Sequence, residues 1–563
     1  MARSLLNSRS EGLGKELAMK GKKGKGRYRG LLALVAIVVA GCGGTASTSD
    51  LSSSGGGTDV SSTAQSPAEL GVGDFLVVDF QDNAGSMDFT GVADGVKFIL
   101  SVGSANESGV GSSVRLSTSL SLPDPVTGEK AMDVESAYDE SDGYGVEEIF
   151  NAWLRAAEMD LDLTEVPAYH EADVSNFKGM SVKAVGLGDN ETFRVLSSLS
   201  STSSYVEVTG NVRYLGTNVA CYIDSRVTDD MLSDADIAQL CSGFDAEAGE
   251  EQDLLGDSSD VDDDGLTHVL MTPQINRLGA LGGGIITGYF YAADLYARSD
   301  NNQVSNHREV IYTLVPDPDG IHGTPISNAF AMSNLLPAVM PHELQHAISY
   351  NQHVFVEGGS SEEPWLNEAM SHFIEDYMGH GRENPSRQAL YLASPSTYGI
   401  VTQGSPNLLE RGGEQLFLRY LYEQASDGEQ LLRNLVQTGE RGVENLMNAF
   451  EGSAEMGSFA GMMQRWSIAL AMTDRGISSD SRYVYQPRQR DADTGEWKGV
   501  CLDCDPEDGR GTELRGVHLN SYNGFHSVSV DGSAAKFYDV TAIPDEINLS
   551  GDEDSFAILI RYE

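Results

Sequence analysis

Apolar positions along the chain repeat with two different periods, which predict strands in some segments and helices in others. Segments of helical period occupy the later middle of the chain, at 364–377, 415–424, 429–436, 443–450 and 460–471. Short segments rich in Val, Ile, Leu and Phe predict strands near both ends, at 75–80, 98–102, 114–117, 525–530 and 557–562. The predicted fold class is therefore α+β.

Changes in this pattern also divide the chain. We expect a β-rich module at 67–125, a hinge with one helix at 126–204, a mixed region at 205–475 and a small β-rich region at 476–563. The chain has 563 residues, of which 40% are hydrophobic, and this is enough for several cores. The role of the N-terminal β-rich module is left open.

The N-terminal segment predicts export. Basic residues dominate 1–30, and the unbroken apolar run 31–40 is shorter than the roughly 20 residues that span a bilayer, as in a signal peptide. The sequence Val39-Ala40-Gly41-Cys42 resembles a bacterial lipobox, which implies a signal peptide at 1–41 and a lipid on Cys42. Ordinary cleavage and free secretion is the alternative. Residues 42–66, rich in Ser, Thr and Gly, predict a flexible tether.

We therefore expect the protein in a bacterial cell envelope, anchored to a membrane by its lipid and facing the periplasm or the exterior. Residues 1–41 hold nine basic and two acidic side chains, so their removal takes the formal net charge from −47 to about −54. Such a surface repels nucleic acid, which we exclude as a partner. The acids are spread along the whole chain, which favours a solvated exterior over a preference for cationic substrates.

Four cysteines remain once Cys42 is assigned to the lipid, and an even number in an exported protein suggests disulfides. A bond between Cys221 and Cys241 would close a loop of about 20 residues and stabilise the fold by roughly 3 kcal/mol. Cys501 and Cys504 form a C-x-x-C sequence. No second C-x-x-C is present to complete a zinc site, so we expect a local disulfide rather than a metal or redox centre.

The sequence His342-Glu343-Leu344-Gln345-His346 carries the main candidate chemistry. On a helix, residues four apart share one face, so both imidazoles can bind one metal ion while Glu343 stands beside it as a general base. The alternative is an amphipathic helix with two partly buried histidines. Pro341 precedes the first histidine, so we expect the helix to begin or to kink there.

A third ligand is expected in the helix predicted at 364–377, where Glu368 lies off the apolar stripe. Two histidines and one carboxylate leave an open position on zinc, as catalytic sites require. The pair H-E-x-x-H and N-E-x-x-S, with Trp365-Leu366 before the second motif, resembles the hyicolysin-like family of secreted bacterial zinc peptidases, which are gluzincins. The likeness extends over about 211–472 and implies a two-lobed zinc peptidase at 205–475.

One position departs from the gluzincin pattern. In thermolysin-like relatives an Asp after the Ser of the second motif holds a zinc-bound histidine by its other ring nitrogen, and here that place is His372. Glu375 and Asp376 are possible substitutes. A donor for the developing oxyanion is also needed, and Tyr398 and Arg411 are both candidates.

His353 is not expected to bind the metal. A metzincin-like site needs glycine at 349 and histidine at 352, where this chain has Ser349 and Gln352. On a continuing helix His353 would lie roughly 10 Å along the axis from His346, too far for a zinc–nitrogen bond of about 2 Å.

Calcium is a further candidate. Asp260, Asp262 and Asp264 occupy positions 1, 3 and 5 of a calcium loop, and Gly265 occupies position 6. The twelfth position, where an EF-hand has a bidentate glutamate, is Met271, so an EF-hand is excluded. An incomplete calcium loop and a simple acidic turn before a strand both remain open.

The expected function is an exported, lipid-anchored zinc endopeptidase that acts on a peptide or protein. The predicted strand 310–315 could hold an extended substrate by main-chain pairing if it lies at a sheet edge. No G-x-M-E-N-like motif of aminopeptidases occurs upstream. The alternative from another class is a surface binding or scaffolding lipoprotein that keeps the fold without the activity.

Overall fold

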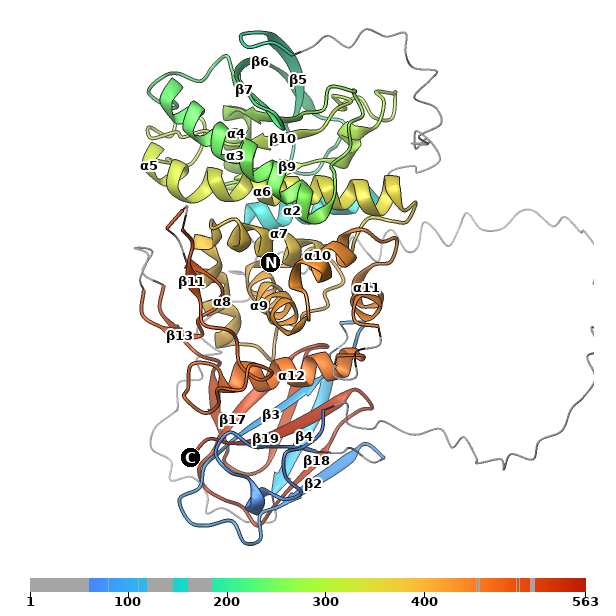
Figure 1. Cartoon of the computed structure of the whole chain (residues 1–563), viewed down its shortest axis with the longest axis vertical. Coiled ribbons are helices and arrows are strands. Elements are labelled where there is room, and N and C mark those ends of the chain that lie inside the picture. Colours follow the sequence, from blue (N-terminus) through green and yellow to red (C-terminus); the bar gives the residue numbers. More distant parts are fainter. Residues whose placement is uncertain are drawn as a thin grey trace, which may run out of the picture. The chain divides into compact units, whose positions relative to one another are not determined.

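The computed structural model describes residues 60–118, 145–159 and 185–563, apart from 79, 81, 110, 452, 454, 455, 493, 496 and 507–511. The predicted signal peptide, Cys42 and most of the predicted tether lie outside the described residues. The described part is a mixed α+β structure, in agreement with the apolar pattern (Figure 1). Within it, no helix is both long enough and apolar enough to cross a bilayer.

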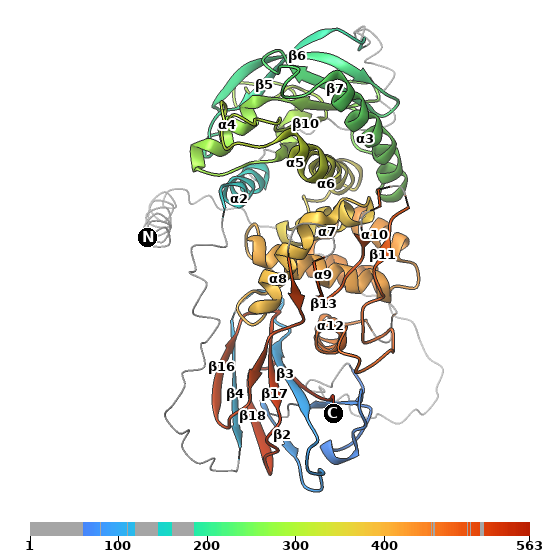
Figure 2. The same ribbon diagram turned by 90° about the vertical axis from the view of Figure 1, so that its left-hand side faces the viewer.

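Strands from both ends of the chain build one pair of sheets. The five-stranded sheet has the order β1 (Phe75–Val78), β19 (Ser555–Arg561), β3 (Phe98–Ser104), β17 (Ala535–Val540) and β15 (Leu519–Ser521). The four-stranded sheet has the order β16 (His526–Val530), β4 (Ser112–Thr118), β18 (Glu546–Ser550) and β2 (Ala84–Asp88). The blue N-terminal strands β3 and β4 therefore lie between red C-terminal strands (Figure 2).

The expectation of two separate β-rich regions, at 67–125 and 476–563, is wrong. Every residue of β3 is buried, and its two neighbours in the sheet, β19 and β17, both come from the C-terminal region. Leu100, Leu116, Ile547 and Leu559 of the two sheets share one hydrophobic core. Local periodicity predicts that a strand exists, but not which distant strand pairs with it.

The predicted tether also ends earlier than residue 66. Val60 is completely buried, and the side chain of Thr63 accepts a hydrogen bond from the Phe75 backbone N–H at 2.8 Å. Residues 60–66 thus pack against β1.

A separate six-stranded sheet is formed by the middle of the chain. Its order is β5 (Asn190–Leu196), β6 (Tyr205–Leu215), β7 (Val219–Asp224), β8 (Thr267–Met271), β10 (Val310–Thr313) and β9 (Gly288–Phe290). Because β5 pairs with β6, the mixed region begins before the expected boundary at 205. The predicted strand 310–315 corresponds to β10, which lies inside the sheet, whereas β9 forms the edge.

Helices form the rest of the described middle region. They are α2 (Val146–Met159), α3 (Asp234–Leu255), α4 (Pro273–Gly282), α5 (Asn328–Phe330), α6 (Leu336–Tyr350), α7 (Pro364–Tyr377), α8 (Asn384–Ala393), α9 (Leu408–Gln424), α10 (Gly428–Val436), α11 (Gly442–Ala449) and α12 (Phe459–Met472). The predictions for α7, α10, α11 and α12 are correct to within one residue. α9 begins seven residues earlier than predicted, at a capping box formed by Asn407 and Glu410.

Short elements complete the described chain. They comprise 3-10 turns at Pro67–Glu69, Ala292–Leu295 and Gly381–Glu383, π-helical turns at Ala331–Leu335 and Asn351–Val356, and two small ribbons, β11 (Gln489–Arg490) with β12 (Trp497–Lys498) and β13 (Asp503–Cys504) with β14 (Leu514–Arg515). The cysteines pair as Cys221 with Cys241, which links β7 to α3, and as Cys501 with Cys504.

The helix α6 occupies the centre of the middle region. It packs against β9 and β10 of the sheet on one side and against α7 on another, and nearly all of its residues are buried. α6 begins directly after a π-helical turn, and Pro341 lies inside the helix. The expectation that the helix could begin at Pro341 is therefore wrong. Beyond α7, the helix α12 reaches the β3 strand, where the Ser101 and Ser467 hydroxyls are 2.5 Å apart.

Candidate metal centre

The helices α6 and α7 bring three predicted ligands together. His342 Nε2 and His346 Nε2 each lie 3.7 Å from a different carboxylate oxygen of Glu368. His342 and His346 lie one turn apart on α6, and Glu368 faces them from the first half of α7. One possible ligand atom of each residue lies within 4.8 Å of the others, so this buried group could hold a metal ion.

The carboxylate of Glu368 is suited to a cation. It is 1% exposed, and neither of its oxygens accepts a hydrogen bond from the described residues. Arg411 of α9 makes an ion pair with it at 3.1 Å. Burial favours the neutral acid, but Arg411 and the three nearby histidines outweigh it and hold the pKa of Glu368 below its ordinary value. The group is therefore an ionised, buried carboxylate that could serve as a ligand.

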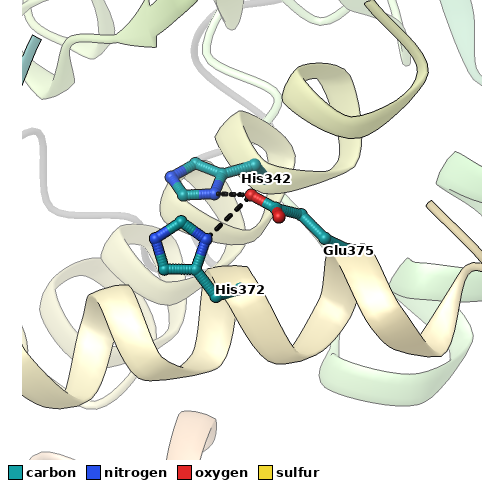
Figure 3. A group of neighbouring side chains, drawn as sticks. All are labelled: His342, His372 and Glu375. Carbon is teal, nitrogen blue, oxygen red and sulfur yellow. Dashed lines mark hydrogen bonds and ion pairs between the residues drawn. The ribbon is translucent and has the colours of Figure 1, made fainter. Parts of the chain in front are cut away.

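Glu375, one of the two substitutes considered from sequence, holds the first histidine. Its Oε1 accepts hydrogen bonds from His342 Nδ1 at 2.8 Å and from His372 Nδ1 at 2.9 Å (Figure 3). This fixes the tautomer of His342 so that Nε2 faces Glu368. Asp376, the other substitute, pairs instead with Arg419 and with the backbone N–H of Gly499.

His372 is part of the same cluster. Its Nδ1 is held by Glu375, and its Nε2 is 3.9 Å from Glu368 Oε2. His342, His372 and Glu375 thus form a second group with possible metal-ligand spacing, which shares His342 with the first. In the sequence, His372 was noted only as a departure from the gluzincin pattern. The signal that could have placed it in the centre is its spacing, because a residue four positions after Glu368 lies on the same face of α7.

The protonation states favour metal binding by two of the imidazoles. Burial lowers the pKa of His346 well below its usual value and lowers that of His372 to about 4, so both are neutral near pH 7. At His342 burial also opposes the charge, but the hydrogen bond to Glu375 and the surrounding carboxylates raise the pKa. A metal ion at His342 Nε2 would therefore compete with a proton more than at the other two imidazoles.

Glu343 lies beside the ligands on α6. It is 4% exposed, and its Oε2 accepts a hydrogen bond from the backbone N–H of Phe290 at 2.8 Å. Burial raises the pKa of Glu343 to about 7. A carboxylate whose pKa lies near neutrality is suited to accept and release a proton.

The other candidates lie elsewhere or act differently. His353 is buried against Glu362, 3.8 Å away, and belongs to neither histidine group. Arg411 is engaged with Glu368 in this state. Tyr398 lies in the connection between α8 and α9 and is partly buried.

The helix α2 covers the edge of the sheet next to this site. Its Arg155 donates to the Phe290 carbonyl at 2.6 Å, and its Glu158 accepts from the Ala292 N–H at 2.8 Å. Nearer the start of α2, Glu147 accepts from the Thr287 N–H at 2.8 Å. Three main-chain groups along the β9 segment are thus occupied by side chains of α2. Sequence analysis gave no function to this helix.

Apolar contacts hold α2 in the same place. Phe150 is completely buried and its ring centre lies 5.4 Å from that of Tyr289 in β9. Leu154 is also completely buried. A small cavity beside His346 is lined by Arg155, Glu158 and residues of α6 and α7.

The fold and the site together define a mixed α+β protein with a buried His/Glu centre between a sheet-bearing region and a helical region. Comparison with known proteins adds nothing to this class, because no protein-family model matches the chain and no curated protein matches it either. Functional inference therefore depends on the geometry of the centre.

Proposed function

We propose that this protein is a zinc-dependent endopeptidase of the gluzincin type, with two lobes that hold a peptide between them. The observation that carries the proposal is the convergence of His342 Nε2, His346 Nε2 and the Glu368 carboxylate in one buried cluster. Two imidazoles and one carboxylate are a donor set that suits zinc and leaves a position for a reactant.

In this proposal His342, His346 and Glu368 hold the zinc ion, which supplies Lewis acidity when bound. Glu343 takes a proton from the attacking water and passes it to the leaving amine. The hydrogen bond from the Phe290 N–H keeps the Glu343 carboxylate in a fixed position. Glu375 orients His342 through Nδ1 and leaves Nε2 for the metal.

The substrate would pair with the edge strand β9 rather than with the interior strand β10. A peptide added to a sheet edge needs the outward N–H and C=O groups of that strand. In the described structure side chains of α2 bind the Phe290 C=O in β9 and the N–H groups of Thr287 and Ala292 on either side of it. The proposed enzyme is therefore in a closed state, and α2 must leave the edge before a long peptide can bind.

Export and lipid attachment at Cys42 belong to the proposal on sequence grounds alone. The competing function is a surface binding or scaffolding lipoprotein with a peptidase-like fold. It predicts metal binding without hydrolysis, whereas the proposed enzyme combines both.

The decisive experiment compares wild type with Glu343→Gln in zinc content and in cleavage of a mixed peptide pool. The variant removes the base but none of the three ligands, so it should keep zinc and lose peptide hydrolysis. Glu357→Gln, an exposed change of the same kind on the segment after α6, should keep both. Equal cleavage by wild type and Glu343→Gln would refute the mechanism, and zinc binding without cleavage in the wild type would favour the scaffold.

A further inference from the structure

A second group of acidic side chains lies in the loop before β8. Asp260 Oδ1 accepts hydrogen bonds from the backbone N–H groups of Asp264 at 3.0 Å and Gly265 at 3.1 Å. Asp263 and Gly265 have positive φ angles of 58° and 73°, so the loop curls around its own carboxylates. This is the loop whose first six positions match a calcium loop in sequence.

Glu309 enters this loop from a distant part of the sequence. It directly precedes β10, which pairs in parallel with β8 so that Val310 lies opposite His268. Its Oε1 accepts hydrogen bonds from the Ser259 hydroxyl at 2.7 Å and from the Val261 N–H at 2.9 Å. The register of the sheet therefore supplies a glutamate that the twelfth loop position, Met271, does not.

The other oxygen of Glu309 has no partner. Glu309 is 1% exposed, and its Oε2 is buried without a hydrogen bond to any described residue. One carboxylate oxygen each of Asp260, Asp262 and Glu309 lies within 4.8 Å of the others. A buried, unpaired carboxylate beside two others is costly unless a cation joins them. In agreement, burial raises the pKa of Glu309 to about 7.

An imidazole and a guanidinium face only one side of the loop. His268 Nε2 lies 3.1 Å from Asp264 Oδ2, and Arg308 Nε lies 3.5 Å from Asp262 Oδ2. Asp262 Oδ1, however, is buried without a hydrogen bond within the described structure. The free oxygens of Asp262 and Glu309 are thus the ones that the protein's own cations do not satisfy.

We propose that Asp260, Asp262 and Glu309 form a calcium site that ties the loop before β8 to the start of β10. All three donors are carboxylate oxygens, which are the ligands that Ca²⁺ prefers, whereas zinc favours imidazole and thiolate. His268 stands behind the site, with its Nε2 3.6 Å from Asp262 Oδ2. The site is separate from the histidine centre and does not depend on the proposed peptidase activity.

The test is calcium binding by the whole protein with zinc supplied, followed by thermal unfolding with and without Ca²⁺ and by Tb³⁺ luminescence. Wild type should show a calcium-dependent rise in Tm of several degrees and saturable Tb³⁺ emission that Ca²⁺ displaces. Glu309→Gln should weaken calcium binding by about tenfold or more, because it removes a charged ligand. In this variant the side-chain amide oxygen can still accept the hydrogen bonds from the Ser259 hydroxyl and the Val261 N–H.

Asp263→Asn is the matched control, because Asp263 is exposed in the same loop and the change in charge is identical. It should leave calcium binding almost unchanged. If Glu309→Gln responds to calcium as wild type does, or if wild type shows no calcium-dependent shift, the proposal is wrong.

Loss of folding is tested separately. Without calcium, Glu309→Gln should unfold at the same or a higher temperature than wild type, and Asp262→Asn should repeat the loss of affinity.

Discussion

Removing the aromatic anchor of α2 should activate the proposed peptidase. Phe150 is completely buried against Tyr289 of β9, the strand that we assign to substrate binding. Replacing a buried phenylalanine by alanine costs about 3–5 kcal/mol. If that loss falls on the closed position of α2, the ratio of open to closed states rises by roughly 10²–10⁴, since about 1.4 kcal/mol corresponds to a factor of ten.

The gain in activity depends on how strongly α2 is held. When the closed state dominates, the apparent kcat/KM is proportional to the open fraction, so activity rises with that fraction until α2 is mostly open. The polar contacts of Glu147, Arg155 and Glu158 remain in Phe150→Ala, so the change weakens the closed state without removing it. We expect kcat/KM for a long fluorogenic peptide to increase by at least about tenfold.

The control is the neighbouring Ile149→Ala. Ile149 is 54% exposed on the outer face of α2, so its truncation should leave kcat/KM close to the wild-type value. Zinc content and Tm are measured for both variants in order to separate opening of α2 from general damage. A folded, zinc-loaded Phe150→Ala protein with unchanged or lower activity would refute the role of α2 as a cover.

Three further predictions concern the centre and its surroundings. Glu375→Ala should lower zinc affinity by about 10–100-fold in a chelator competition assay, because it releases Nδ1 of His342; unchanged affinity would argue against this role. Glu368→Ala should reduce zinc content and activity together, whereas His353→Ala should keep the zinc and lose only stability; the reverse zinc contents would contradict the gluzincin assignment. Glu251→Gln should raise Tm increasingly as pH rises above about 4.5, because burial holds the pKa of Glu251 well above that ordinary value and ionisation then opposes folding. An equal change in Tm at pH 5 and pH 8 would show that its charge is not the cause.

Sequence reasoning was most successful where the chemistry depends on local spacing. The i and i+4 positions of His342 and His346 required only that the segment be helical, and the structure places them on one face of α6. Glu368 required a second helix to approach, and the apolar stripe of 364–377 predicted that helix correctly. The predicted pairing of Cys221 with Cys241 likewise joins two residues that are only 20 positions apart in the sequence.

The rest depends on the partners of strands, which local periodicity does not encode. The strands at both ends of the chain were predicted separately, yet β3 lies between two C-terminal strands. The order of the middle sheet placed β9 at the edge and β10 inside. The same order brought Glu309 to the Asp260 loop, where sequence spacing alone had found no twelfth ligand.

His372 stands where the gluzincin pattern has an Asp, and the residues around it offset that difference. The gluzincin pattern has an Asp at this place to hold a zinc-bound histidine, and an imidazole has no negative charge for that task. Glu375 lies one helical turn further along α7, about 4.5 Å along the axis, and a glutamate is one methylene longer than an aspartate. It reaches His342 and also binds His372, which fixes both rings through one oxygen. The departure from the pattern is thus offset three residues later. His372 also places its Nε2 3.9 Å from Glu368 Oε2, beside the proposed zinc ligands.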